Sequence, residues 1–191
     1  MTWEMKQVRF STVQDLFEAY PTAGEDVGKG DPGLQSLDFL RQLVDAQDWE
    51  PAISLCAYLL PRREAVAWGC RSLRRMVDHF EASEDRAIAY AEEWAEQPEE
   101  WRRTRALALG NRNNRRAATT WLALAAGWSG GSVMPPECEH REAPPEQTAR
   151  AVRVALFVGL SRLPREARDR IMTPCLEDGI QAVRGEPRAG R

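Results

Sequence analysis

The chain has 191 residues, 43% of them hydrophobic and 29% charged, which is enough apolar material to build the core of one domain. Its 26 basic and 29 acidic residues give a net charge of −3, and this balance predicts neither a nucleic-acid-binding surface nor an acidic tail. No stretch approaches the roughly 20 apolar residues of a membrane span, and residues 1–10 lack the basic-then-apolar pattern of a signal peptide.

The four cysteines are widely spaced and lie mostly in apolar stretches with a helical pattern. They are Cys56, Cys70, Cys138 and Cys175. A disulfide framework is typical of small secreted chains, whereas buried reduced thiols are typical of cytosolic ones. We therefore expect a cytoplasmic protein that does not insert into a membrane.

Residues 1–33 are predicted to form an N-terminal appendage in three parts. Residues 1–10 alternate imperfectly between apolar and polar side chains, which indicates a short extended arm. Residues 12–20 have the pattern of a short helix that Pro21 ends. The segment from there to residue 33 is rich in glycine and proline and is predicted to be a loop.

Residues 34–185 are predicted to form a single helical domain. Residues 34–44 have a broad apolar face, which is typical of an amphipathic helix. Residues 52–60 are apolar on nearly every side, and this predicts a central, buried helix. Pro61 suits the first position of the next helix, where its missing N–H costs nothing.

The helix after Pro61 is predicted to have one apolar seam and one arginine-rich side. The seam residues are spaced alternately by four and three positions, and they are Val66, Cys70, Leu73, Val77 and Phe80. The opposite side carries Arg71, Arg74, Arg75 and Asp78. We expect the seam to face the core and the arginines to face solvent.

Three further helices are predicted between residues 83 and 128. Ser83 is a suitable N-cap for a helix that reaches Gln97, with acidic residues in its first turn. Pro98 is predicted to open the next helix and Gly110 to end it. The third helix runs from about residue 114 to residue 128.

A long loop rich in proline and glycine follows at residues 129–147, and loops of this length in a compact domain are functional or disordered. A strongly apolar helix is predicted at about residues 145–163. Thr173 and Pro174 have the character of an N-cap and first position, which predicts that a separate last helix begins there. Residues 186–191 are predicted to be a flexible tail.

This pattern predicts an all-α fold, an irregular bundle or array of about eight helices.

No sequence motif in the chain indicates an enzymatic reaction. Gly24 and Gly28 are separated by three residues and a glycine follows Lys29, whereas a phosphate-binding loop has four intervening residues and then Lys-Ser or Lys-Thr. Cys138 and His140 lie close together, but a structural zinc ion needs four ligands. We expect no metal, no cofactor and no enzyme activity; a small enzyme whose site assembles only in space is the alternative.

The arginines near Trp101 and Trp121 form either a nucleic-acid-binding surface or a solvated surface with local ion pairs. They are Arg102, Arg103, Arg105, Arg112, Arg115 and Arg116. A continuous basic stripe would indicate nucleic-acid binding, but Glu99 and Glu100 adjoin this group. We favour a solvated surface with local ion pairs and expect no nucleic-acid partner; a regulatory nucleic-acid-binding protein is the less favoured alternative.

Seven tryptophans are the most distinctive feature of the composition, because each carries a large apolar surface and one N–H that needs a partner. Trp121 shares a helix face with alanines and with Trp128, and both are predicted to lie in the core. Trp128 also ends its helix at the mouth of the long loop, while Trp68 lies off the apolar seam, where it would meet another helix or a cation. The partner-binding candidates are Trp68, Arg71, Arg74, Arg75, Trp128, Gly130 and Gly131.

Three motifs occur in order along the chain: LPRREAVAWGC at residues 60–70, WLALAAGWSGGS at residues 121–132 and GIQAVRG at residues 179–185. Together they resemble an uncharacterised family of small helical bacterial proteins that is often associated with type VI secretion gene clusters. The resemblance covers residues 35–187 and brings no catalytic residues. It implies an accessory or adaptor role in a secretion apparatus. Tryptophan and arginine are enriched at interface hot spots, so we predict a protein–protein interaction module whose partner is a secretion-system component.

Overall fold

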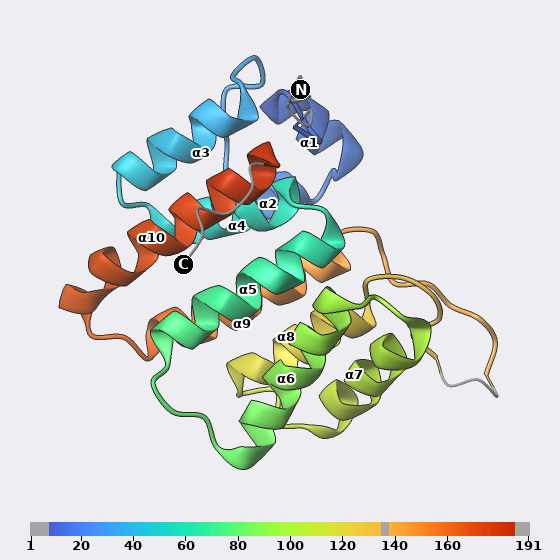
Figure 1. The fold of residues 1–191 in the computed structure, drawn as a ribbon. Coiled ribbons are helices and arrows are strands. Elements are labelled where there is room, and N and C mark those ends of the chain that lie inside the picture. The colour runs from blue at the N-terminus through green and yellow to red at the C-terminus, as the bar shows by residue number, and fades with distance from the viewer. Residues whose placement is uncertain (1–7, 135–137, 186–191) are drawn as a thin grey trace, which may run out of the picture.

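The computed structural model describes residues 8–134 and 138–185, and its regular structure within them consists of ten α-helices (Figure 1). They are α1 Val13–Ala19, α2 Ala23–Val27, α3 Ser36–Asp45, α4 Trp49–Leu59, α5 Arg62–Met76, α6 Ala82–Glu96, α7 Glu100–Arg112, α8 Ala118–Gly127, α9 Gln147–Ser161 and α10 Arg165–Arg184. The described residues contain two isolated bridges, Thr12 with Gln35 and Ser132 with Glu142, and no strand. The prediction of an all-α fold is confirmed. Most of the predicted arm (residues 1–7) and the predicted tail lie outside the described residues.

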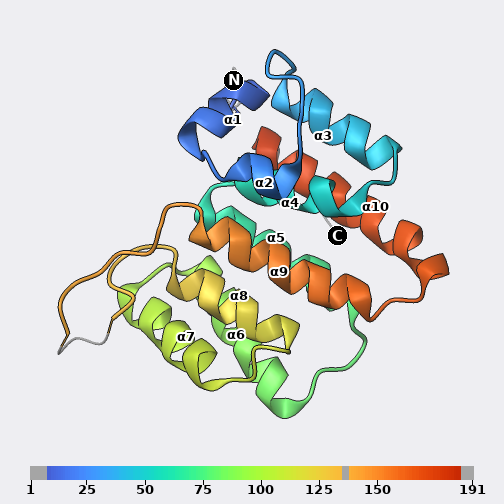
Figure 2. The same ribbon diagram turned by 180° about the vertical axis from the view of Figure 1, so that it is seen from behind.

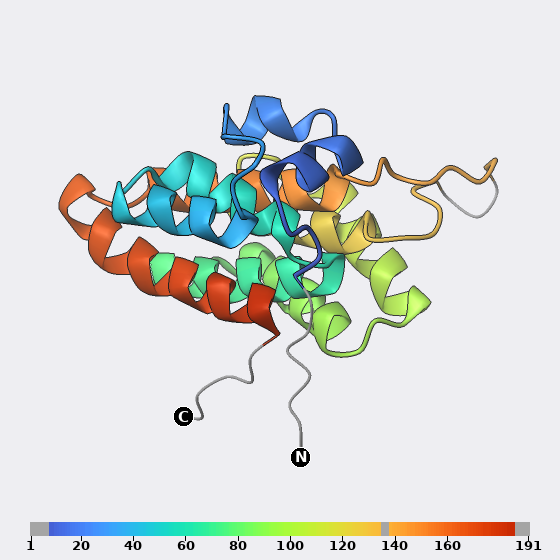
Figure 3. The same ribbon diagram turned by 90° about the horizontal axis from the view of Figure 1, so that it is seen from above.

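The helices pack in two layers (Figures 1 and 3). One layer places α10, α5 and α6 side by side, and the other places α3, α4, α9, α8 and α7 in that order. The layers meet where α5 lies on α9 and where α6 lies on α8. The short helices α1 and α2 lie on the outer side of the second layer, against α3 and α4 (Figure 2).

The centre of the core is formed by helices that are apolar on nearly every side. In α4 every residue from position 52 to position 59 is buried, so the prediction of a central helix there is confirmed. In α8 nine of the ten residues are buried, all except the half-buried Trp121, and the helix separates α9 from α7. Burial of one leucine or isoleucine side chain contributes about 1.5–3 kcal/mol to stability, and α4 buries three of them, Ile53, Leu55 and Leu59.

A glycine of α10 allows this helix to pack closely on α5 and α4. A Cβ atom at Gly179 would lie 3.0 Å from Nε1 of Trp68 and would collide with Sγ of Cys56. Both neighbours are fully buried and cannot move aside. The absence of a side chain at this position therefore sets the distance of α10 from α5 and α4.

A short helix, α2, occupies part of the segment that was predicted to be a loop. Ala23 and Val27 are buried against the rest of the protein, and Asp26 is bonded to side chains of α4 and α9. A five-residue helix is not stable by itself, so these tertiary contacts order it. Glycine content alone therefore gave the wrong prediction here.

Two helix ends also lie elsewhere than predicted. Glu81, not Ser83, precedes the first turn of α6, and its N–H donates to the carboxylate of Glu84 at 3.3 Å. Gly110 does not end its helix but lies inside α7, where a Cβ atom would come within 2.8 Å of Cγ of Leu124. This glycine therefore serves the contact between α7 and α8.

Helix α10 continues through Pro174, so the prediction of a separate last helix beginning there is wrong. Proline removes one backbone N–H from the helix. The carbonyl of Cys175 accepts a hydrogen bond from Nε1 of Trp68 at 2.7 Å, and the carbonyl of Pro174 accepts one from Arg75 at 3.3 Å. These contacts with α5, together with the buried face of α10, hold both halves of the helix in place.

Arginine side chains of α5 cover the end of a neighbouring helix. The guanidinium of Arg63 donates to the carbonyl of Ala95 at 2.6 Å and to that of Glu96 at 3.0 Å. These carbonyls belong to the last turn of α6, where the helix itself provides no donor. One planar guanidinium satisfies two of them at once.

Candidate functional site

Trp68, the first partner-binding candidate, lies in the core. Its side chain is fully buried where α5 crosses α10, against Gly179. Its indole N–H has a backbone partner, the carbonyl of Cys175, so the polar requirement of the ring is met inside the protein. Trp68 thus meets another helix, one of the two environments expected for it, and a partner cannot reach it in this structure.

The arginines of α5 connect helices to one another. Arg74 donates twice to the carboxylate of Glu92 in α6, at 2.6 and 2.7 Å. Arg75 pairs with Asp178 in α10 at 2.7 Å, and Arg71 is half-buried. The side chains of Arg74 and Arg75 are about 40% exposed, so each pair contributes roughly 0–1 kcal/mol. Their main role in this structure is to join α5 with its two neighbours in the layer.

The other candidates lie at the far end of α5, where the long loop leaves the body of the protein (Figure 1). Trp128 caps the C-terminus of α8 and packs edge-to-face on Trp121, with ring centroids 6.5 Å apart. Both rings are half-buried, so the prediction that they are core residues holds only in part. Arg75 follows the first residue of α5 by 13 positions, or about 20 Å of helix, so the two groups of candidates do not converge.

Gly130 and Gly131 differ in what surrounds them. A Cβ atom at Gly130 would meet nothing within 4 Å. Gly131 has a φ of 59°, a left-handed conformation that favours glycine, and a Cβ atom there would lie 2.9 Å from the guanidinium of Arg103. Gly131 is therefore the position at which the loop requires glycine.

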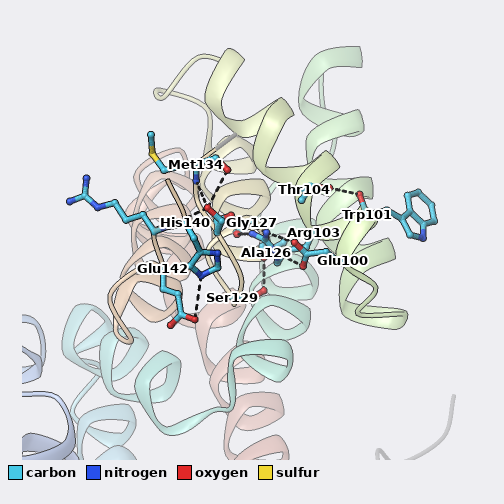
Figure 4. A network of polar contacts seen from close by, with 12 residues as sticks. Glu100, Trp101, Arg103, Thr104, Ala126, Gly127, Ser129, Met134, His140 and Glu142 are labelled. Carbon is cyan, nitrogen blue, oxygen red and sulfur yellow. Dashed lines mark hydrogen bonds and ion pairs between the residues drawn. The ribbon is translucent and has the colours of Figure 1, made fainter. Parts of the chain in front are cut away.

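A buried arginine of α7 holds the start of this loop (Figure 4). Arg103 is only 3% exposed, and its guanidinium donates to the carbonyl oxygens of Gly127 and Ser132. It also makes two bonds to the carboxylate of Glu100, at 2.8 and 2.6 Å, which hold the pKa of that carboxyl below its usual value. A buried charge is costly unless it is paired and hydrogen-bonded, and Arg103 has one ion pair and four hydrogen bonds.

A second arginine holds both ends of the same loop. Arg62, the first residue of α5, donates to the carbonyl of Ser129 at 2.8 Å and to that of Pro145 at 3.4 Å. Between these points Val133 N–H donates to the carbonyl of Arg141 at 2.8 Å. The base of the 129–146 loop is thus fixed to the helical body, and the loop extends outward from it (Figures 1 and 3).

Two large apolar side chains are exposed in this part of the molecule. Trp101 is 52% exposed and Met134 is 38% exposed, and both are exceptions among the described residues. Met134 lies on the loop, while Trp101 points outward from α7 on the other side of Arg103 (Figure 4). The Trp101 ring lies between cations, with the guanidinium carbons of Arg102 and Arg105 at 4.5 and 5.0 Å from its centroid.

Three of the six arginines that were considered for nucleic-acid binding, Arg102, Arg103 and Arg105, pair with acids. Arg102 bonds to Glu99 at 3.1 Å, and Arg105 bonds to Glu93 and stacks over Tyr90. These pairs agree with the predicted surface of local ion pairs. Arg103 is the exception because it is buried.

The loop residues in which a metal site was considered are exposed. Cys138 and Glu139 face solvent, and Nε2 of His140 lies 3.7 Å from the carboxylate of Glu142. Residues 8–134 and 138–185 contain no group of three or more histidine, cysteine, aspartate or glutamate side chains that could hold a metal ion.

Within the same residues, no helix is both long and apolar enough to cross a bilayer.

A polar hollow of about 480 Å³ lies apart from the loop, between the start of α6 and the end of α9. His79 and Arg116 contribute to its wall, and Arg162 spans it to bond Glu84 at 3.1 Å. Its acids and bases therefore already neutralise one another in part.

Sequence reasoning missed the two residues that define the loop region. Arg103 was assigned to the solvated surface, yet it shares the buried face of α7 with Ala106, Leu107 and Gly110, three, four and seven positions later. That helical spacing is a signal that would have placed it inside. The exposure of Trp101 has no such signal, because its neighbours in sequence are all charged or polar.

The described residues thus form a two-layered, all-α fold with a long loop on an arginine-fixed base. The chain belongs to the family of unknown function DUF6931, whose model matches residues 39–183. Comparison with curated proteins gives no match, and comparison with solved structures gives none either. The matched segment includes α4–α9 and the whole loop, while α1 and α2 precede it.

Proposed function

We propose that the protein is a non-enzymatic adaptor that binds a protein partner through the 129–146 loop and the adjoining outer surface of α7. The observation that supports this most directly is the contrast between the base of the loop and its surroundings. Arg62 and Arg103 fix the base through buried or half-buried hydrogen bonds, yet Trp101 and Met134 remain exposed beside it. Aromatic residues, methionine and arginine are enriched at protein interfaces.

The loop would enter such an interface at low entropic cost. Ordering a flexible loop on binding costs free energy, and a base that is already fixed reduces this cost. Trp128 and Gly131 belong to that base and would support the interface from behind. Of the predicted candidates, these two and Gly130 stay in the proposal.

We also propose that the partner is a component of a type VI secretion apparatus and that the protein acts in the cytoplasm. This part rests on the resemblance of residues 60–70, 121–132 and 179–185 to proteins associated with such gene clusters. The first two motifs lie next to the loop, because Arg62 and Ser129 are bonded to each other.

The test is an affinity capture from the native bacterium with three variants. Trp101→Ala combined with Met134→Ala is expected to lose the specific partner, because both side chains are exposed and the fold does not depend on them. Arg103→Gln is expected to weaken capture by loosening the loop without touching the partner. Glu166→Ala, on the exposed start of α10, is the matched control and is expected to capture normally. Equal capture by all four proteins would refute the interface, and a captured partner outside the secretion apparatus would refute the assignment of the system.

A further inference from the structure

Three donors from α4 and α9 converge on one carboxylate of α2, on the face of the molecule opposite α10 (Figure 2). The hydroxyl of Tyr58 donates to Oδ2 of Asp26 at 2.6 Å, and Nε of Arg150 donates to the same oxygen at 2.9 Å. Nη1 of Arg153 lies 3.0 Å from Oδ1. The Asp26 side chain is only 10% exposed, so these are partly desolvated, charge-assisted bonds.

One of the two arginines, Arg153, is also positioned by residues other than Asp26. Nε of Arg153 donates to Oγ of Ser54 at 2.9 Å, and its guanidinium lies 4.8 Å from the ring centroid of Phe157. Both contacts come from α4 and α9 themselves. Arg153 therefore keeps its position when the Asp26 carboxylate is absent, whereas the second ion pair of Arg150 is with Glu25 of the same helix α2.

The carboxylate that fills the site belongs to a helix that is too short to be stable by itself. Helix α2 has five residues and no side-chain hydrogen bond at its N-cap, and Gly28 follows it with a φ of 85°. Such a short helix exists only while it is docked. It also precedes the family match at residues 39–183, whereas Tyr58, Arg150 and Arg153 all lie within that match.

We propose that the surface formed by Tyr58, Arg150 and Arg153 is a binding site for an acidic helical segment of a partner protein, and that α2 occupies it in cis. Release of α2 exposes the Tyr58 hydroxyl and two arginines, of which Arg153 is held in place by Ser54. This proposal is independent of the loop interface, because it concerns other helices and another face of the protein.

The occupant in cis indicates the chemistry of the partner segment. Asp26 supplies the carboxylate, Glu25 adds a second acid 3.6 Å from Arg150, and Ala23 and Val27 bury apolar surface on either side. The site therefore fits a helical turn with two consecutive acids, a small residue three positions before the second acid and an apolar residue after it. An arginine fork recognises such a carboxylate better than a lysine would.

The test uses a fluorescent synthetic peptide of residues 20–30 and the full-length protein. Asp26→Asn in the protein weakens the occupant in cis, and the apparent affinity for the peptide rises in proportion to the open fraction, by about tenfold or more. A peptide that itself carries Asp26→Asn should not bind, and a protein with Asp26→Asn and Arg153→Gln should lose the gain. Equal affinity of wild-type and Asp26→Asn protein, or equal binding of the two peptides, overturns the proposal.

A second variant covers the case in which Asp26→Asn does not fold, as judged by circular dichroism. Val27→Ala removes apolar contact of α2 but leaves all three donors intact, and it should also raise peptide affinity above that of the wild type. Hydrogen exchange supplies an independent readout. Saturating peptide should speed exchange in residues 23–27 of the protein and leave α8 unchanged, and unchanged exchange in residues 23–27 in the presence of bound peptide overturns displacement.

Discussion

The indole N–H of Trp68 donates to the carbonyl of Cys175, the residue directly after Pro174 in α10. The bond ties α5 to the one turn of α10 that proline weakens. It also explains why the first motif of the resemblance contains a tryptophan at a position that no partner can reach. The residue acts within the fold, as a polar contact inside an apolar interface.

Replacement of Trp68 by phenylalanine should lower the free energy of unfolding by about 1–3 kcal/mol beyond the loss of ring size, because the carbonyl of Cys175 loses a buried donor. Urea denaturation followed by circular dichroism measures this. Trp121→Phe is the control, because the indole N–H of Trp121 donates to the exposed backbone carbonyl of Arg115. This variant should lower the free energy of unfolding by less. Equal losses in the two variants would contradict a special role for the bond to α10.

Gly179→Ala should destabilise the protein by about 1–3 kcal/mol, because the new methyl group overpacks a site bounded by Cys56 and Trp68. The matched control is Gly24→Ala in α2, where a Cβ atom meets nothing within 4 Å. That substitution replaces glycine by a better helix former and should stabilise by up to about 1 kcal/mol. Thermal unfolding of both variants checks the opposite signs, and a Gly179→Ala variant as stable as wild type would contradict the close approach.

The pairing of Glu100 with Arg103 should make the loop base sensitive to acid. Hydrogen bonds from Arg103 lower the pKa of Glu100 in the folded protein below its ordinary value of 4.5. A carboxyl with a lowered folded pKa contributes stability above its unfolded pKa and loses it as pH falls through the folded pKa. The difference in unfolding free energy between wild type and Glu100→Gln should therefore be constant above about pH 5 and shrink below pH 4.5. A difference that does not change with pH would contradict the pairing.

The thiols should differ sharply in reactivity. Burial raises the pKa values of Cys56, Cys70 and Cys175, whereas Cys138 is exposed on the loop. Reactivity follows the accessible thiolate, so a thiol reagent at pH 8 should titrate one cysteine in the native protein and all four in urea. Cys138→Ser should abolish the fast phase, and fast labelling of a second thiol would contradict the burial of the other three.

Helix content and the central position of α4 followed from the sequence, because apolar periodicity reflects burial directly. Boundaries were less predictable where tertiary contacts override local preference. Pro174 and Gly110 both read locally as helix ends, yet packing against α5 and α8 keeps their helices continuous. The segment around Asp26 shows the opposite case, in which distant arginines order a stretch that has no helical pattern of its own.

Of the candidate site, the loop, its glycines and Trp128 were predictable from the sequence. Gly131 lies in a glycine-rich turn whose composition indicates a left-handed conformation, and the structure places it there. Trp68 was misplaced because sequence cannot tell an indole that fills an interhelical gap from one at a surface. Residues that act across long sequence distances, such as Arg62 with Pro145, leave no local pattern at all.

The arginine forks of α5 and α7 have a consequence for how the protein opens. The last turn of α6 depends on Arg63, and the last residue of α8 depends on Arg103. A helix end normally frays independently because its terminal carbonyls turn to water. Here each of these ends is closed by a side chain of another helix, so α6 cannot fray unless the start of α5 moves, and α8 cannot fray unless α7 does. Local openings at these points are thereby merged into larger cooperative ones.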